Sequence, residues 1–167
     1  YAMLDHPSDK VRTLAIRVLI SKEPHNIKRL FPFIKDPYEP IQKEIFAWMD
    51  NQKSEQLENH LIGYMKKNLH QSDPDHILAC YKALGHCGSA STIPFLRRIL
   101  LKDGWNSFTG FGKLTHRRGA GCALALLDTW EAKDILLEAS NSKFPVVRQA
   151  FHESMAIINE PGDQSNE

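Results

Sequence analysis

The sequence lacks the features that mark membrane-spanning, disulfide-rich or strongly charged proteins. Its 167 residues include 21 Lys and Arg against 20 Asp and Glu, a net charge of +1, whereas a polyanion-binding domain usually carries a clear basic excess. No apolar run approaches the roughly 20 residues that span a bilayer. The three cysteines, Cys80, Cys87 and Cys122, cannot all pair within the chain. Cys80 and Cys122 fall at apolar helix positions, so we expect free thiols in a reducing, cytoplasmic setting.

The sequence also lacks the short motifs that carry catalysis or metal binding. It has no C-x-x-C, no H-E-x-x-H, no Gly-rich phosphate loop and no G-x-S-x-G. One His-Glu pair, at 152–153, is too few for a carboxylate-bridged metal site, which needs several converging ligands. Cys87 stands beside His86, but neighbouring side chains in an expected turn point apart. We therefore expect no catalytic residue, no metal and no cofactor.

What the sequence does contain is an internal repeat. A ten-residue frame begins at Val11, Ile41, His76, Arg118 and Val147. Its fifth and ninth places are mostly apolar and lie four residues apart, so they share one face of a helix. The starts are 29 to 42 residues apart, which is the range of helix–turn–helix repeats.

A second segment of helical periodicity follows each of the first four frames. Short loops between the segments require antiparallel neighbours, and no stretch alternates with the period of a strand. The sequence therefore predicts an all-α protein of about nine helices in four and a half repeats, forming one domain over residues 1–158. The expected second helices are 25–34, 54–67, 89–101 and 130–139. The expected repeats are 4–34, 35–70, 71–101, 114–139 and 140–158, with an insertion loop at 102–115 and a polar tail at 159–167.

The turns that precede the frames point to a known family. The pattern D-P-x-x-x-V-R-x-x-A-x-x-x-L is met by residues 5–20 and, with Ser142 in place of Asp, by residues 142–156. It is weaker at 36–50, where Gln42 replaces the Arg, and at 73–85, where Ile77 does. The chain resembles the HEAT-like repeat family, in the bacterial form also found in phycobilisome lyase subunits. The resemblance implies a right-handed α-α superhelix, the HEAT-type α-solenoid, and leaves function open, because such repeats serve many roles.

The insertion is the first candidate contact region. It carries three aromatic residues among glycines and ends in cations, and loops longer than about 12 residues are often functional. The side chains form a contact surface for a peptide, a nucleobase or a planar ligand, or fold back as a plug over the edge of the stack, and the two roles are not exclusive. Its candidate residues are Trp105, Phe108, Phe111, Lys113, Arg117 and Arg118.

Paired cations on the expected second helices form the other candidate region. The pairs are Lys28-Arg29, Lys66-Lys67 and Arg97-Arg98. In HEAT stacks the second helices line the concave side, so successive pairs would make a basic stripe suited to phosphates or an acidic partner. Alternatively, cations late in a helix complement its negative end and cover apolar surface with their stems.

These features favour a protein-interaction or scaffold module of a larger bacterial regulatory protein. We expect it to bind a protein partner through the concave helix face and the 102–118 segment. The chain opens at Tyr1, and we expect it to be a piece of a longer protein. The alternative is a nucleic-acid-binding domain that resembles the HEAT-like alkylpurine DNA glycosylases, with a basic groove. A chromophore-related role, by analogy with the lyase subunits, has no residue here in its favour.

Overall fold

The computed structural model describes residues 3–22, 29–68, 73–102 and 114–159. Within these ranges every regular element is helical and no strand occurs, which confirms the predicted all-α class. None of the described helices has the length and apolar character needed to cross a bilayer. The elements are α1 (Asp9–Lys22), η2 (Phe31–Lys35), α2 (Glu39–Asn51), α3 (Glu55–Asn68), α4 (Pro74–Cys87), η4 (Ala90–Thr92), α5 (Ile93–Leu101), α6 (Leu114–Leu127), α7 (Trp130–Ser140) and α8 (Pro145–Asn159), where η marks a 3-10 helix.

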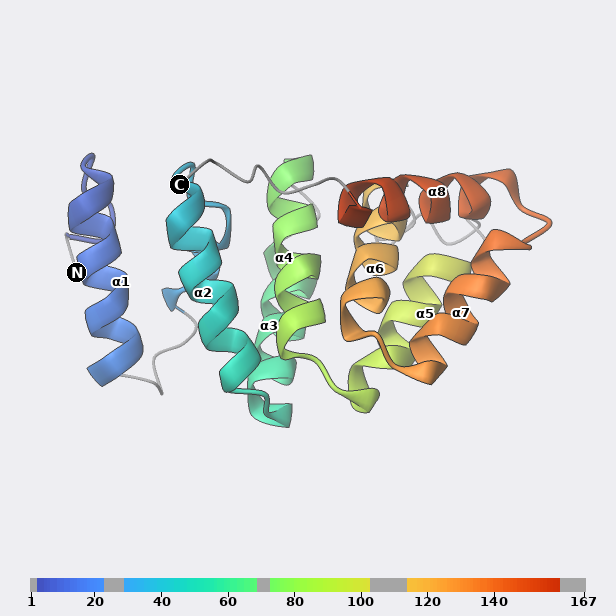
Figure 1. The fold of residues 1–167 in the computed structure, drawn as a ribbon, viewed down its shortest axis with the longest axis horizontal. Helices are drawn as coiled ribbons and strands as arrows, with labels where there is room; N and C mark the ends of the chain where they lie inside the picture. Colours follow the sequence, from blue (N-terminus) through green and yellow to red (C-terminus); the bar gives the residue numbers. More distant parts are fainter. Residues whose placement is uncertain (1–2, 23–28, 69–72, 103–113, 160–167) are drawn as a thin grey trace.

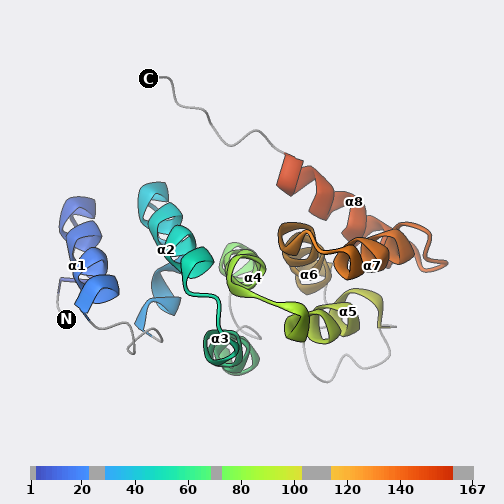
Figure 2. The same cartoon turned by 60° about the horizontal axis from the view of Figure 1, so that its bottom comes forward.

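The five repeated frames lie in α1, α2, α4, α6 and α8, which follow one another across the molecule (Figure 1). We call these the first helices, and α3, α5 and α7 the second helices. Among the first helices, α4 packs against α2 and α6, and α6 packs against α8. The second helix α3 packs on α4, while α5 packs on both α6 and α7. In Figure 2, α3 and α5 lie on the opposite side of α4 and α6 from α8.

The first helices pack through the apolar places of the frame and through small residues. Leu19, Met49 and Leu84, which occupy the ninth place, are buried. Helices α4 and α6 approach each other closely, since a Cβ added to Gly119 would lie 2.3 Å from Cδ2 of Tyr81. The two helices can meet at this distance because glycine has no side chain to separate them.

The aspartates that precede the first helices serve two different purposes. Asp73 caps α4, accepting a 2.9 Å hydrogen bond from the amide of His76, as an N-terminal Asp typically does. Asp36 instead accepts from the amide of its neighbour Tyr38 at 2.9 Å and pairs with Arg12 of α1. The turn before α2 is therefore tied to the preceding repeat through an ion pair.

Two expected boundaries need correction. The described residues contain eight α-helices; residues 25–28 of the expected helix 25–34 lie outside the described part, and Phe31–Lys35 forms a 3-10 helix where the end of that α-helix was expected. Pro32 stands in the first turn of that element, and Pro37 disfavours helical geometry at Asp36, so the element ends at Lys35. Helix α6 begins at Leu114, so residues 114 and 115 belong to the helix and not to the expected loop. Residues 103–113 and the tail from 160 onward lie outside the described part.

Candidate functional site

The expected basic stripe is represented in the structure by cations of α3 and α5. Lys66 Nζ lies 5.8 Å from the ring centroid of Phe95 on α5. Arg98 is one helical turn beyond Phe95, so the cations of α3 and α5 lie close together. Lys66, Lys67, Arg97 and Arg98 are all exposed, and we call these four residues the second-helix patch. Arg29 is also exposed, whereas Lys28 lies outside the described residues.

One cation of the patch is already engaged. Arg97 donates from Nη2 to Oε2 of Glu138 on α7 at 2.8 Å, and both side chains are about half exposed. An exposed pair of this kind contributes only about 0–1 kcal/mol to stability. The patch is therefore open to a polyanion, although part of its charge is neutralised within the chain.

The structure divides the candidate residues of the insertion into three groups. Trp105, Phe108, Phe111 and Lys113 lie outside the described residues. Arg118 is half-buried on α6, with Nη1 3.6 Å from Oε2 of Glu153 on α8.

Arg117 was expected to belong to the contact surface, but it is buried in the structure. Its side chain is only 1% exposed, and its guanidinium donates to the carbonyl oxygens of Leu100 and Lys102 at the end of α5. The last carbonyls of a helix have no partner within it, and a cation there also complements the helix dipole. Arg117 thus joins the end of α5 to α6 and is unavailable to a partner.

A groove of about 850 Å³ opens on the side of the first helices. Its volume falls within the range of about 300–1,000 Å³ typical of ligand-binding pockets. Residues of α2, α4, α6 and α8 line it, and in Figure 2 α2 and α8 extend beyond α4 on the same side. We call this feature the first-helix groove. Its apolar lining consists of Phe46, Leu78, Ala79, Leu126, Ile157 and Ile158.

Charged side chains stand at the rim of the first-helix groove. Lys43 pairs with Glu39 at 2.9 Å on α2, and Lys35 pairs with Asp73. Lys82 and Asp75, both on α4, line the groove, and neither takes part in an ion pair among the described residues.

Two of the residues that line the groove form an aromatic stack. The rings of His86 and Phe46 lie nearly parallel, with centroids 5.0 Å apart and an interplanar angle of 16°. Nδ1 of His86 lies 3.0 Å from Oδ2 of Asp50 on α2. These contacts hold α2 against α4 and fix the position of the Phe46 ring. An apolar floor with a charged rim is the usual anatomy of a protein-binding surface.

The first-helix groove was not predicted from the sequence, where the cations of the second helices were the more conspicuous feature. A signal was present in the frame, since Phe46 and Leu78 are apolar residues outside its fifth and ninth places. Ile157 extends the same apolar character past the end of the last frame. Apolar residues off the buried face of a repeat would have indicated a second, open apolar surface.

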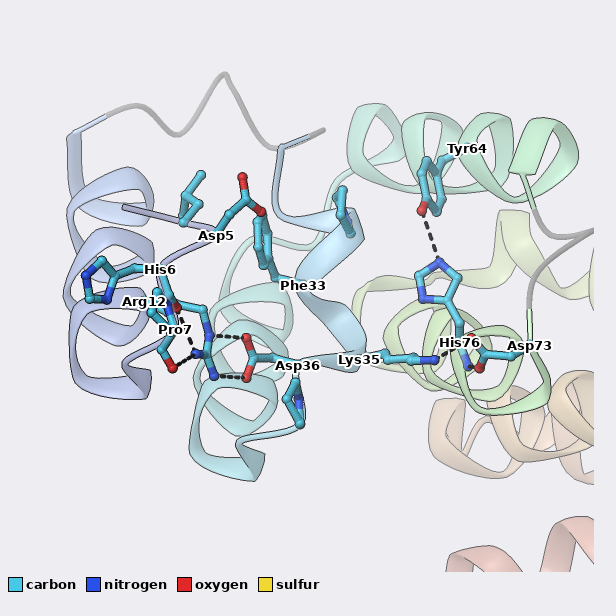
Figure 3. Close-up of a pocket in the computed structure, with 13 residues that line it drawn as sticks. Asp5, His6, Pro7, Arg12, Phe33, Lys35, Asp36, Tyr64, Asp73 and His76 are labelled. Atoms are coloured by element: carbon cyan, nitrogen blue, oxygen red, sulfur yellow. Dashed lines mark hydrogen bonds and ion pairs between the residues drawn. The ribbon is translucent and has the colours of Figure 1, made fainter. Parts of the chain in front are cut away.

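A second pocket, of about 560 Å³, lies between the start of α1, η2 and the helices α3 and α4 (Figure 3). Arg12 donates from Nε and Nη2 to the two carboxylate oxygens of Asp36 at 2.8 and 2.9 Å. It also donates from Nη1 to the carbonyls of His6 and Pro7, both at 3.0 Å. Burial acts to raise the pKa of Asp36, but the hydrogen bonds from Arg12 and from the Tyr38 amide lower it overall.

The other side of this pocket is equally occupied by internal contacts. Nε2 of His76 shares a hydrogen bond with the Tyr64 hydroxyl at 3.0 Å and lies 3.7 Å from Sγ of Cys80. Burial lowers the pKa of His76, with Asp73 opposing and Lys35 adding to the shift, so the ring is neutral at pH 7. Within the described ranges no group of three His, Cys, Asp or Glu could hold a metal ion. The pocket connects repeats through its polar contacts and offers few uncommitted groups to a ligand.

The cysteines are buried and carry no disulfide. Burial raises the pKa of Cys80 and Cys87 to about 12 and that of Cys122 to about 11. A cysteine nucleophile needs a lowered pKa. The raised pKa of Cys87 is the opposite of what a nucleophile needs, although His86 is its neighbour in the sequence.

The described residues thus define an all-α protein of successively packed helices with an apolar groove on one side and a basic patch on another. A scan against protein-family models finds no match, and searches of curated proteins and of solved structures find no significant relative.

Proposed function

We propose that the chain is a HEAT-type α-solenoid, a right-handed α-α superhelix, that serves as a protein-interaction or scaffold module of a larger bacterial regulatory protein in the cytoplasm. The regular order of first helices supports this fold. So do the contacts between repeats, because Arg12 pairs with Asp36 of the next repeat and Lys35 pairs with Asp73 of the one after. Successive repeats are thereby joined at the entry to their first helices, as expected for a stack in which each repeat contacts its neighbours.

The observation that carries the proposed activity is the first-helix groove. Phe46 and Leu78 are half-buried there and remain accessible. Since the groove is built from helices that pack directly on one another, its shape is preformed. A preformed surface loses little conformational entropy on binding, which favours affinity. The protein partner would bind in this groove, on the opposite side from the second-helix patch.

Site-specific photo-crosslinking in cells of the source organism tests this proposal. A benzoylphenylalanine replaces Leu78 or Gln42 at the groove and, as a matched control, the exposed Asn59 on α3. We expect the same discrete protein adduct from both groove positions and none from position 59. Adducts of equal yield at all three positions, or adducts to nucleic acid alone, would contradict the assignment.

Nucleic-acid binding is the second candidate, and the second-helix patch favours it. Four exposed cations on two helices near Phe95 can contact several phosphates, and each phosphate contact steepens the salt dependence of duplex binding by about 0.9 in log–log slope. Salt-dependent retention on duplex DNA measures this. The variant Arg97→Ala with Arg98→Ala should lower the slope, whereas Lys43→Ala on α2 should not. Retention that neither variant changes would remove this candidate.

A further inference from the structure

The chemistry of the groove walls limits which kind of protein segment can occupy it. The bottom is α4 and the walls include α2 and α8, and backbone groups inside an α-helix are already hydrogen-bonded within it. No strand edge exists in the described ranges, so a partner cannot bind by adding a strand. An extended segment would lay its amides over Leu78 and Ala79 without partners, at a cost of about 1–3 kcal/mol for each buried unsatisfied group. A helix satisfies its own backbone and avoids this cost.

The pattern of side chains along α4 also suits a helix. Leu78, Ala79, Lys82 and His86 recur at helical spacing and all line the groove, so one face of α4 forms the bottom. Ala79 leaves room for close approach of a second helix, since its side chain is a single methyl group. Helix-in-groove recognition uses apolar anchors at i, i+3 or i+4, and i+7, and Phe46, Leu78 and Ala79 offer apolar surface for such anchors.

The charges of α4 specify the direction of that helix. Asp75 and Lys82 both line the groove and have no ion-pair partner among the described residues. They are seven residues apart on α4, which is about 10.5 Å along its axis. A complementary helix therefore carries a cation opposite Asp75 and an anion opposite Lys82, two turns apart.

The helix dipole selects between the two possible orders. Acidic residues are stabilising near the N-terminus of a helix and basic residues near its C-terminus. An occupant with its acid first and its base seven residues later satisfies this preference. To place the acid against Lys82 and the base against Asp75, it must run antiparallel to α4.

Building on the proposed protein-binding function of the groove, we propose that its occupant is an amphipathic α-helix of the partner, antiparallel to α4. Its apolar stripe rests on Phe46, Leu78 and Ala79. Its edge carries an Asp or Glu that pairs with Lys82 and, seven residues further on, a Lys or Arg that pairs with Asp75.

The test uses a phage-displayed library of 18-residue amphipathic helical peptides, panned on the full chain, with the edge positions randomised. The selected peptide is synthesised, and its Kd is measured by fluorescence polarisation. We expect the acid–x₆–base order to be enriched. We expect Lys82→Glu to weaken binding about tenfold, which corresponds to about 1.4 kcal/mol, and Lys67→Glu on the opposite side to leave it unchanged. A peptide whose acid is changed to Lys should restore binding to the Lys82→Glu variant.

Several outcomes would overturn the inference. They are enrichment of Pro-containing extended peptides, enrichment of the reverse charge order, and failure of the charge exchange to restore binding. If Lys82→Glu lowers the Tm, Lys82→Gln replaces it, and a peptide affinity equal to that of the wild type then counts against the inference. These results leave the photo-crosslinks at positions 42 and 78 unaffected, so the groove can still bind a protein in another conformation. Absence of those crosslinks instead contradicts the proposed function itself.

Discussion

Replacing Arg117 by Met should destabilise the protein strongly. The same replacement of an exposed arginine would have little effect on stability. The side chain is 1% exposed and donates to two carbonyls at the end of α5. Methionine has a similar length and no donor, so both carbonyls would lose their partner in a buried location. Hydrogen bonds to charged groups contribute about 1.5–3 kcal/mol each.

The net loss is smaller than the sum of the two bonds. Removing the guanidinium also removes the cost of burying a charge, and replacing buried charged groups by apolar ones recovers about 1–4 kcal/mol in other proteins. We therefore expect a loss of about 3 kcal/mol in the free energy of unfolding. For a chain of this size, about 2–4 °C of Tm is lost per kcal/mol, which gives a fall of about 6–12 °C.

Thermal unfolding followed by circular dichroism measures this change. The adjacent Arg118→Met is the matched control, because Arg118 is partly exposed and its nearest acid, Glu153, is 3.6 Å away. An exposed pair contributes about 0–1 kcal/mol, so its Tm should fall by less than about 4 °C. Equal Tm values for the two variants would refute the role that we assign to Arg117.

Three further changes test the packing and the ionisation of the core. Gly119→Ala should lower the urea midpoint, because its Cβ would lie 2.3 Å from Tyr81, whereas Gly63→Ala meets nothing within 4 Å and should raise it slightly. Burial acts to raise the pKa of Glu58, but hydrogen bonds from Ser91 and other hydroxyls lower it overall. The stability that ionised Glu58 adds is therefore complete above the unfolded pKa of about 4.3 and is lost as pH falls through the folded pKa. In the Glu58→Gln variant the urea midpoint should therefore change less between pH 5 and pH 3 than it does in the wild type. The three buried cysteines should react with a thiol reagent slowly in buffer and fully in urea; fast reaction of the native protein would contradict their burial.

The positions of the first helices were predictable because each depends on a local pattern. The frame that starts at Ile41 places Ile45 and Met49 on one face, and both are fully buried. Asp73 and Pro74 predicted the start of α4, which begins at Pro74 and is capped by Asp73. Signals of this kind need only neighbouring residues, so periodicity and capping rules locate them.

The features that were wrong or missed depend on residues far apart in the sequence. Arg117 looked like the basic end of a loop, and its burial arises only because α6 begins at Leu114 and brings it to the end of α5. The first-helix groove requires α2, α4 and α8 to be placed relative to one another. Phe46 and Ile157 are more than 100 residues apart, and no local pattern states that they line the same hollow.

The most direct test of the account is a map of the binding surface. The backbone amide signals of the full chain are assigned by NMR and followed during titration with the peptide selected on it. We predict that the signals of Phe46, Leu78 and Lys82 shift together while those of Lys66 and Arg98 stay in place. Shifts confined to Lys66, Arg98 and their neighbours would contradict the claim that this protein binds its partner on the first-helix side.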